Sequence, residues 1–218
     1  MTRSLWWLVA LSIAASGCVS TTVQEIRRAS TGISASESVV VLGRHEANTA
    51  ESEDDFVSCV SDHIGRGRNS VGVIGEQRFM DALYPWFEPR TAPLNTSDLP
   101  GLMDKPLLSH RLRSIGARYL VWIDGNTQVT DKGGALTCSI SPTGAGCFGF
   151  LSWENDSAYE AQIWDIKNGT EVGKISSDAN GTSFMPAVIV PVPFIARVQS
   201  SACSSLADQL KLFITKGS

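Results

Sequence analysis

The sequence predicts an α/β protein built on a single mixed β-sheet flanked by helices. Three patterns support this: a strand–helix–strand start at residues 39–74, period-two strands in the second half, and an amphipathic helix near the C-terminus. About 200 residues follow position 18, enough for the one α/β domain expected over 38–218.

The first unit is predicted to be a βαβ motif. Residues 38–42 are apolar and mostly β-branched, as in a strand buried on both faces. A helix is expected from Ser52 to about Gly65, because acidic residues fill its first turn and apolar residues recur on one face. That face consists of Phe56, Cys59, Val60, His63 and Ile64. Residues 71–74 supply the second buried strand.

The middle of the chain predicts two helices separated by a stiff loop. Glu76 to Leu83 forms a short helix, which Pro85 ends. Proline is frequent over residues 85–106, which predicts an extended segment. A helix resumes at Leu107, and residues 119–123 then form the most apolar strand, expected at the centre of the sheet.

From residue 124 onward the pattern predicts β-hairpins. Strands are expected at 136–140 and 147–153, and again on either side of Asn168-Gly169, the strongest short hairpin signal. A two-residue turn there would place Trp164 opposite Gly173.

Two elements complete the predicted domain. Residues 185–196 contain three prolines and predict an edge or covering segment. A final helix over about 201–214 has an inner stripe formed by Cys203, Leu206, Ala207, Leu210 and Phe213.

Motifs for enzyme chemistry are weak, and we expect no catalytic activity and no cofactor. Residues 144–149 match G-x-G-x-x-G, but strand patterns on both sides favour a glycine-rich hairpin over a dinucleotide site. His45, His63 and His110 show no i, i+4 histidine pairing, and no C-x-x-C or Cys/His spacing predicts zinc. A hydrolase whose Ser/His/Asp triad is dispersed in sequence stays an alternative.

Two places are candidates for binding. Asp124 follows the predicted central strand, where open α/β sheets bind ligands, although an Asp-Gly turn explains it as well. Tyr84, Trp86 and Phe87 crowd one proline-flanked loop, either as contacts for a partner protein or as lids over the core. The formal net charge of −4 argues against nucleic acid as a partner.

The cysteines predict two disulfides. Cys138 and Cys147 flank a predicted hairpin, so their pairing is geometrically easy, while Cys59 and Cys203 lie on the inner stripes of two helices. Four cysteines allow three connectivities, and we favour Cys138–Cys147 with Cys59–Cys203.

The N-terminal 18 residues resemble a bacterial lipoprotein signal. Arg3 precedes the largely apolar run 5–15, which is too short to span a bilayer, and Ala15-Ser16-Gly17-Cys18 resembles a lipobox. The resemblance implies cleavage before Cys18 and membrane attachment through a diacylglyceryl group on its thiol. An ordinary secretory signal that contains a cysteine is the alternative. Residues 19–37 are rich in Ser and Thr and predict a flexible tether.

The order of elements, together with the lipobox, resembles small outer-membrane lipoproteins of the curli-secretion and penicillin-binding-protein-activator kind. Those proteins carry a domain like the N-terminal domain of TolB. The resemblance implies a periplasm-facing, non-catalytic role in assembling or regulating an envelope complex through an envelope protein partner. Val19, where an inner-membrane retention aspartate would often stand, implies the outer membrane. A periplasmic binding module for a small ligand or glycan is the alternative.

Overall fold

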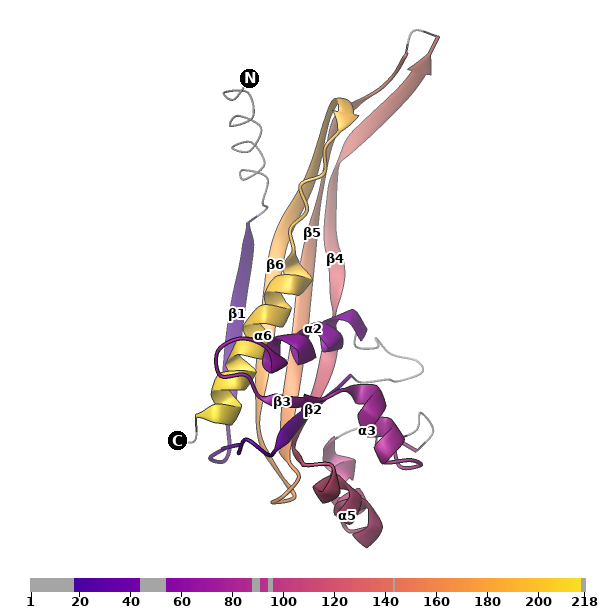
Figure 1. Cartoon of the computed structure of the whole chain (residues 1–218). Coiled ribbons are helices and arrows are strands. Elements are labelled where there is room, and N and C mark those ends of the chain that lie inside the picture. Colours follow the sequence, from indigo (N-terminus) through magenta and orange to yellow (C-terminus); the bar gives the residue numbers. More distant parts are fainter. Residues whose placement is uncertain (1–17, 44–53, 88–90, 94–95, 143, 217–218) are drawn as a thin grey trace, which may run out of the picture. The chain divides into compact units, whose positions relative to one another are not determined.

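Six strands form one mixed β-sheet in the order β1-β6-β5-β4-β2-β3. Helices flank this sheet, and a long helix ends the chain, so the predicted α/β fold class is confirmed (Figure 1). The computed structural model describes residues 18–43, 54–87, 91–93, 96–142 and 144–216.

The elements have the following bounds. The strands are β1 Val19–Arg27, β2 Ser38–Gly43, β3 Gly72–Ile74, β4 Ala117–Ser141, β5 Gly144–Asp165 and β6 Thr170–Pro191. The helices are α2 Asp54–Gly65, α3 Glu76–Ala82, α4 Leu99–Met103, α5 Pro106–Ser114 and α6 Val198–Thr215, with a 3₁₀ turn η1 at Thr96–Asp98.

The chain clusters into two compact units, where the sequence predicted one domain over 38–218. Among the described residues, the core unit holds those within 22–126, 158–178 and 202–216, and the hairpin unit holds those within 18–21, 127–157 and 179–201. The difference arises because β4, β5 and β6 are far longer than the sequence predicted and continue from one unit into the other.

The predicted βαβ start is confirmed. Strand β2 pairs in parallel with β3 on one side, where Val39 lies opposite Val73, and with β4 on the other, where Val41 lies opposite Val121. The predicted central strand therefore lies inside the sheet, between β2 and β5. Since successive side chains alternate between faces, β2 buries apolar residues on both sides.

Helices α2 and α6 are joined by a disulfide, and α2 packs on the sheet in the core unit. Phe56 of α2 stacks on Tyr159 of β5 with ring centroids 3.4 Å apart. Every residue of the stripe predicted for α6 is fully buried. The face predicted for α2 is partly wrong, because Val57 is buried whereas His63 is exposed. Cys59 is half-buried, because its side chain forms a disulfide with Cys203 of the neighbouring helix α6 and does not pack on the strands.

A second apolar layer covers the opposite side of the core unit's strands. Phe79 of α3 and Leu108 of α5 belong to a buried cluster that includes Leu120 and Trp122 of β4. The predicted extended loop over 85–106 is wrong in part, since it contains η1 and α4. Pro100 stands in the first turn of α4, where its missing N–H costs no helical hydrogen bond.

The prediction of a flexible tether over 19–37 is wrong for its first half. Residues 19–27 form β1, which pairs at the edge of the sheet beside β6. Val19, Thr21 and Val23 are half-buried and alternate with exposed residues, so one face of this strand packs inward.

The turn after β5 has four residues, 166–169, where the sequence predicted two. The Asp165 carboxylate explains the longer turn, because it accepts hydrogen bonds from the backbone N–H groups of Lys167 (2.9 Å) and Asn168 (3.0 Å). The longer turn shifts the pairing of β5 with β6, so Trp164 does not lie opposite Gly173. The aromatic ring that covers Gly173 belongs to Phe213 of α6, because a Cβ on Gly173 would stand 2.7 Å from that ring.

Candidate functional site

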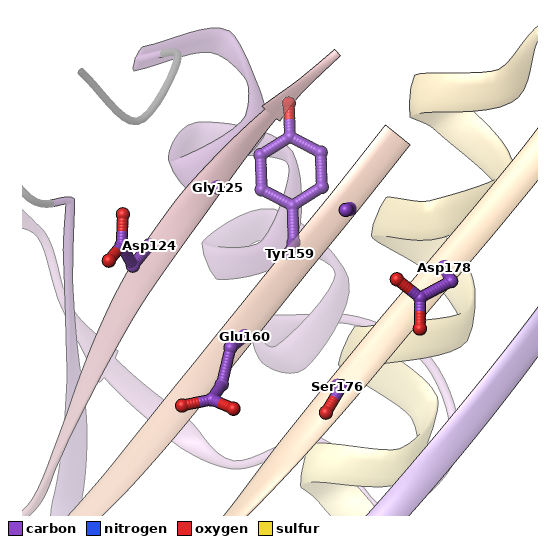
Figure 2. A pocket seen from close by; sticks show the side chains of 7 residues that line it. Asp124, Gly125, Tyr159, Glu160, Ser176 and Asp178 are labelled. Carbon is purple, nitrogen blue, oxygen red and sulfur yellow. The ribbon is translucent and has the colours of Figure 1, made fainter. Parts of the chain in front are cut away.

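An open hollow of about 470 Å³ lies on the sheet of the core unit. Three acidic side chains project from three neighbouring strands at its wall: Asp124 from β4, Glu160 from β5 and Asp178 from β6 (Figure 2). Gly125, Ala158, Tyr159 and Ser176 complete the lining. We call this the acidic hollow.

The hydrogen bonds of the acidic hollow define its chemistry. Glu160 accepts a charge-assisted hydrogen bond from the Lys174 ammonium at 2.8 Å and one from the Gln162 amide at 3.3 Å. Asp178 is exposed. Carboxylates accept hydrogen bonds and attract cations, so the hollow suits hydroxyl-bearing or positively charged groups.

Asp124 lines this hollow, but its predicted setting is wrong. Strand β4 continues to Ser141, so Asp124-Gly125 lies within the strand, neither at its carboxyl end nor in a turn. Gly125 has φ +136°, and a Cβ there would stand 2.7 Å from the Tyr159 Cα, so only glycine fits this close approach between strands. Sequence analysis missed Glu160, Ser176 and Asp178. The sequence does contain a signal for a polar strand face, because the polar residues at 174, 176 and 178 are spaced by two along β6.

The aromatic loop divides between core and surface. Phe87 is buried and meets Phe79 edge to face with centroids 4.8 Å apart, so its ring is a lid over the core. Trp86 is partly buried against the same cluster, with the Arg111 guanidinium 5.4 Å from its ring centroid. Tyr84 is 62% exposed and is the one of the three whose ring lies open to a partner.

Both favoured disulfides are present. Cys138 and Cys147 are joined across the β4–β5 hairpin, and Cys59 and Cys203 join α2 to α6. The predicted pairing is therefore confirmed.

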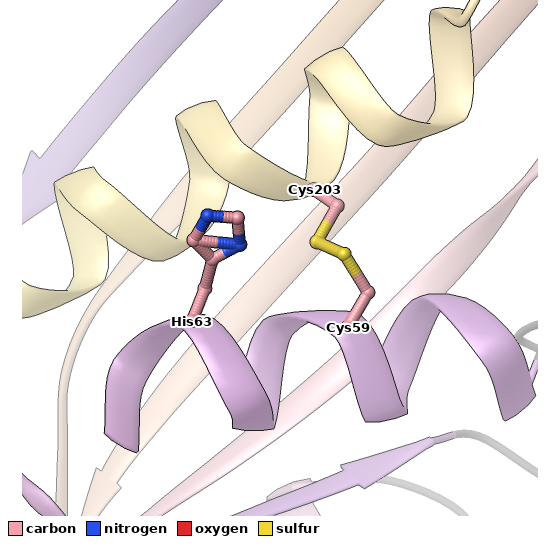
Figure 3. A group of neighbouring side chains, drawn as sticks. All are labelled: Cys59, His63 and Cys203. Atoms are coloured by element: carbon pink, nitrogen blue, oxygen red, sulfur yellow. A yellow bond between two sulfur atoms is a disulfide. The ribbon is translucent and has the colours of Figure 1, made fainter. Parts of the chain in front are cut away.

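His63 lies beside the second bridge, one helical turn after Cys59 (Figure 3). The ligand atoms of Cys59, His63 and Cys203 lie within 4.8 Å of one another, but sulfurs bonded to each other do not bind zinc as thiolates. The sequence analysis found no Cys/His spacing for a metal, although Cys59 and His63 stand four positions apart in the sequence. His110 is exposed on α5, and His45 lies outside the described residues.

Cys18 immediately precedes β1 and is exposed, and it is the one cysteine of the chain outside a disulfide. Of the signal segment predicted over residues 1–18, residues 1–17 lie outside the described part of the chain. Among the described helices, none is both long and apolar enough to cross a membrane.

The glycine-rich segment 144–149 begins β5 directly after the β4–β5 turn. The segment continues as β5, which pairs beside β4 in the sheet, and this confirms the hairpin interpretation. A smaller hollow of about 220 Å³ lies nearby in the hairpin unit, lined by Lys132, Gly133, Gly134, Leu151, Ser152 and Trp153.

Comparisons with known proteins find similarity only at the level of solved structures. No family model and no curated protein matches the chain. A PelC dodecamer from Paraburkholderia phytofirmans aligns over 90% of this chain and 99% of its own, with a TM-score of 0.38 and 15% identity. A point variant of PelC from the same organism aligns over 90% and 100%, with a TM-score of 0.39 and 14% identity.

Proposed function

We propose that this chain is a lipid-anchored protein of the bacterial envelope that acts through contacts and not by catalysis. The observation that carries the proposal is the state of its cysteines. Four of the five are consumed in two disulfides, and the exposed one, Cys18, closes the lipobox-like stretch. Two disulfides also suit an oxidising compartment such as the periplasm.

Acyl labelling in a Gram-negative host tests the anchor. We expect a clickable fatty-acid analogue to label the wild-type protein and the Cys138→Ser/Cys147→Ser control, while Cys18→Ser loses the label and leaves the membrane fraction. Labelling that persists in Cys18→Ser, or a wild-type protein without label, contradicts the proposal.

The proposed location is the outer membrane, with the domain facing the periplasm. The support is Val19, which follows the modified cysteine in place of an aspartate. Val19→Asp should move the protein to the inner membrane on a density gradient. An unchanged distribution would contradict this assignment.

The proposed role is assembly or regulation of an envelope complex, as the resemblance to curli-secretion and penicillin-binding-protein-activator lipoproteins implies. The exposed Tyr84 ring gives a defined place to test for a partner protein. A photo-crosslinking residue at Tyr84 should capture a specific envelope protein, whereas the same residue at Leu107, which is similarly exposed on α5, should not. Identical capture from both positions contradicts a specific contact at Tyr84.

The acidic hollow favours a second candidate function, the binding of a small ligand or glycan. Carboxylates on three adjacent strands can accept several hydrogen bonds from sugar hydroxyls at once. Calorimetric titration with a panel of neutral and amino oligosaccharides should detect binding that Asp124→Asn/Asp178→Asn weakens at least tenfold. Binding that is absent, or equal in the variant, removes this candidate.

A further inference from the structure

Two segments of the hairpin unit carry no charged residue. One runs from Gly133 to Trp153, between Lys132 and Glu154, and the other from Ala179 to Ala196, between Asp178 and Arg197. Charged residues make up 18% of the whole chain, so 21 and 18 consecutive uncharged residues in one unit are a marked local bias.

Many large apolar side chains of these segments are exposed, while others, such as Trp153, Phe184 and Phe194, are half-buried. Within the described part of the hairpin unit, the buried side chains are small, and Val198 is the largest of them. By contrast, Ile140 is 89% exposed and Val188 is 77% exposed. The unit therefore exposes its hydrophobic side chains instead of packing them into a core of its own.

The two segments lie side by side. A Cβ on Gly146 would stand 3.8 Å from the Cα of Ile189, and the Phe184 ring has its centroid 6.3 Å from that of Phe150 and 4.9 Å from that of Phe194. We call the exposed apolar side chains of the two segments the apolar tip; the most exposed members are Ile140, Phe148, Val188, Ile189, Val190 and Ile195.

Cys18 lies at the boundary of the charge-free region. The Cys18 carbonyl oxygen is 3.0 Å from the position of a Cβ on Gly181, near the start of the second segment. On the neighbouring strand, Asn155 donates a hydrogen bond to Ser183 at 3.2 Å, just beyond the end of the first segment. From Gly181 to Val188, β6 advances roughly 23 Å at about 3.3 Å per residue. An acyl group on Cys18 would thus tether the charge-free region close to the lipid surface.

We propose that the apolar tip contacts the lipid of the bilayer to which Cys18 is anchored. This proposal rests on the proposed lipid anchor. A second copy of the chain could bind by adding a strand to the edge of β6, but residues 192–194 fold back on β6 and occupy that position. There Phe184 and Phe194 exchange backbone hydrogen bonds of 3.0 and 2.8 Å, and the prolines at 186, 191 and 193 offer no N–H. Lipid is therefore the better candidate for the contact.

The tip carries a residue suited to the interfacial layer of the bilayer. Trp153, at the end of the first charge-free segment, has the ring type that is enriched in this layer.

Flotation with vesicles tests the tip independently of the anchor. The protein used is the processed chain from residue 18 with Cys18→Ser, mixed with vesicles of phosphatidylethanolamine and phosphatidylglycerol. We expect it to float, and we expect Val188→Asp/Val190→Asp to weaken binding about tenfold or more. Ile140→Asp/Phe148→Asp, from the other segment, should act in the same way. Leu107→Asp, at an exposed site in the core unit, should bind as the parent does.

The outcomes separate the tip from the anchor. Parent protein that stays unbound, or tip variants that float as well as the parent with unchanged melting temperature, overturn the proposal. It is also overturned if the tip substitutions split an oligomer into monomers without changing vesicle binding. A failed acyl-labelling experiment together with tip-dependent flotation would reject the anchor but retain the lipid contact.

Discussion

At the scale of single residues, charge is concentrated where β2 begins. The Glu37 carboxylate accepts a hydrogen bond from the Ser34 N–H at 2.9 Å and lies 3.8 Å from the Arg118 guanidinium. The Ser34 N–H, followed by the Ser34 hydroxyl and then Arg118, holds the pKa of Glu37 below its ordinary value of 4.5. Arg118 also pairs with the buried Asp165 at 2.5 Å, which links this corner to the β5–β6 turn.

The lowered pKa of Glu37 gives a pH dependence with a definite sign. The folded state favours the charged carboxylate, so its contribution to stability is present above about pH 4.5 and is lost as the pH falls through the folded pKa. Glu37→Gln should therefore lower the melting temperature at pH 7 and converge with wild type in more acidic solution. A difference that is constant from pH 7 to pH 3 would contradict this.

The aromatic loop makes a second prediction at this scale. Phe87→Ala should lower the free energy of unfolding by about 3–5 kcal/mol, because it empties a buried position against Phe79. Tyr84→Ala should change it by less than about 0.5 kcal/mol, because that ring is mostly solvated. Urea unfolding of both variants measures the contrast, and equal losses would refute the assignment of Phe87 to the core.

At the scale of elements, α2 and α6 form one covalently joined layer of the core unit. The bridge between Cys59 and Cys203 spans 144 positions of sequence, whereas that between Cys138 and Cys147 spans nine. In the chain-entropy account a longer loop constrains the unfolded chain more strongly, so the two bridges should differ in their effect on stability.

Removing each bridge in turn measures this difference. Cys59→Ala/Cys203→Ala should lose about 4–5 kcal/mol of unfolding free energy, and Cys138→Ala/Cys147→Ala about 2–3 kcal/mol. Guanidinium unfolding of both variants gives the two values. A greater loss from the hairpin bridge would show that local geometry, not loop length, dominates here.

Elements whose pattern reflects burial were predictable from sequence, and elements decided by distant partners were not. The β2–α2–β3 start and the α6 stripe carry strong apolar periodicity, and both formed as predicted apart from part of the α2 face. Strand β1 was missed because only half of its surface packs, which leaves a Ser- and Thr-rich sequence resembling a linker. The acidic hollow escaped prediction apart from Asp124, since its carboxylates meet only through pairing of β4, β5 and β6.

At the scale of the whole molecule, the two units differ in what they bury. The core unit holds every large side chain that is fully buried among the described residues, including Tyr119, Tyr159 and Phe213. The hairpin unit buries small residues such as Ala187 and Ser183. Local stability follows apolar burial, so one continuous strand should be unequally stable along its length.

Hydrogen exchange along β5 tests this. In the lipid-free protein, amides of residues 158–163 in the core unit should exchange at least tenfold more slowly than those of 146–152 in the hairpin unit. Peptides from the paired stretches of β6 should follow the same order. Equal protection along the strand would mean that the hairpin unit has a source of stability other than side-chain burial.

The two disulfides are nested, and this dictates an order of events during synthesis. A chain emerges from its N-terminus, so Cys59 becomes available first, then Cys138 and Cys147, and Cys203 last of these four. Oxidation in order of appearance would join Cys59 to Cys138. The native bridge therefore requires the Cys59 thiol to remain unpaired until Cys203 has emerged, or thiol–disulfide exchange to correct an early partner. Maturation of this protein should consequently depend on a disulfide isomerase more than on an oxidase alone.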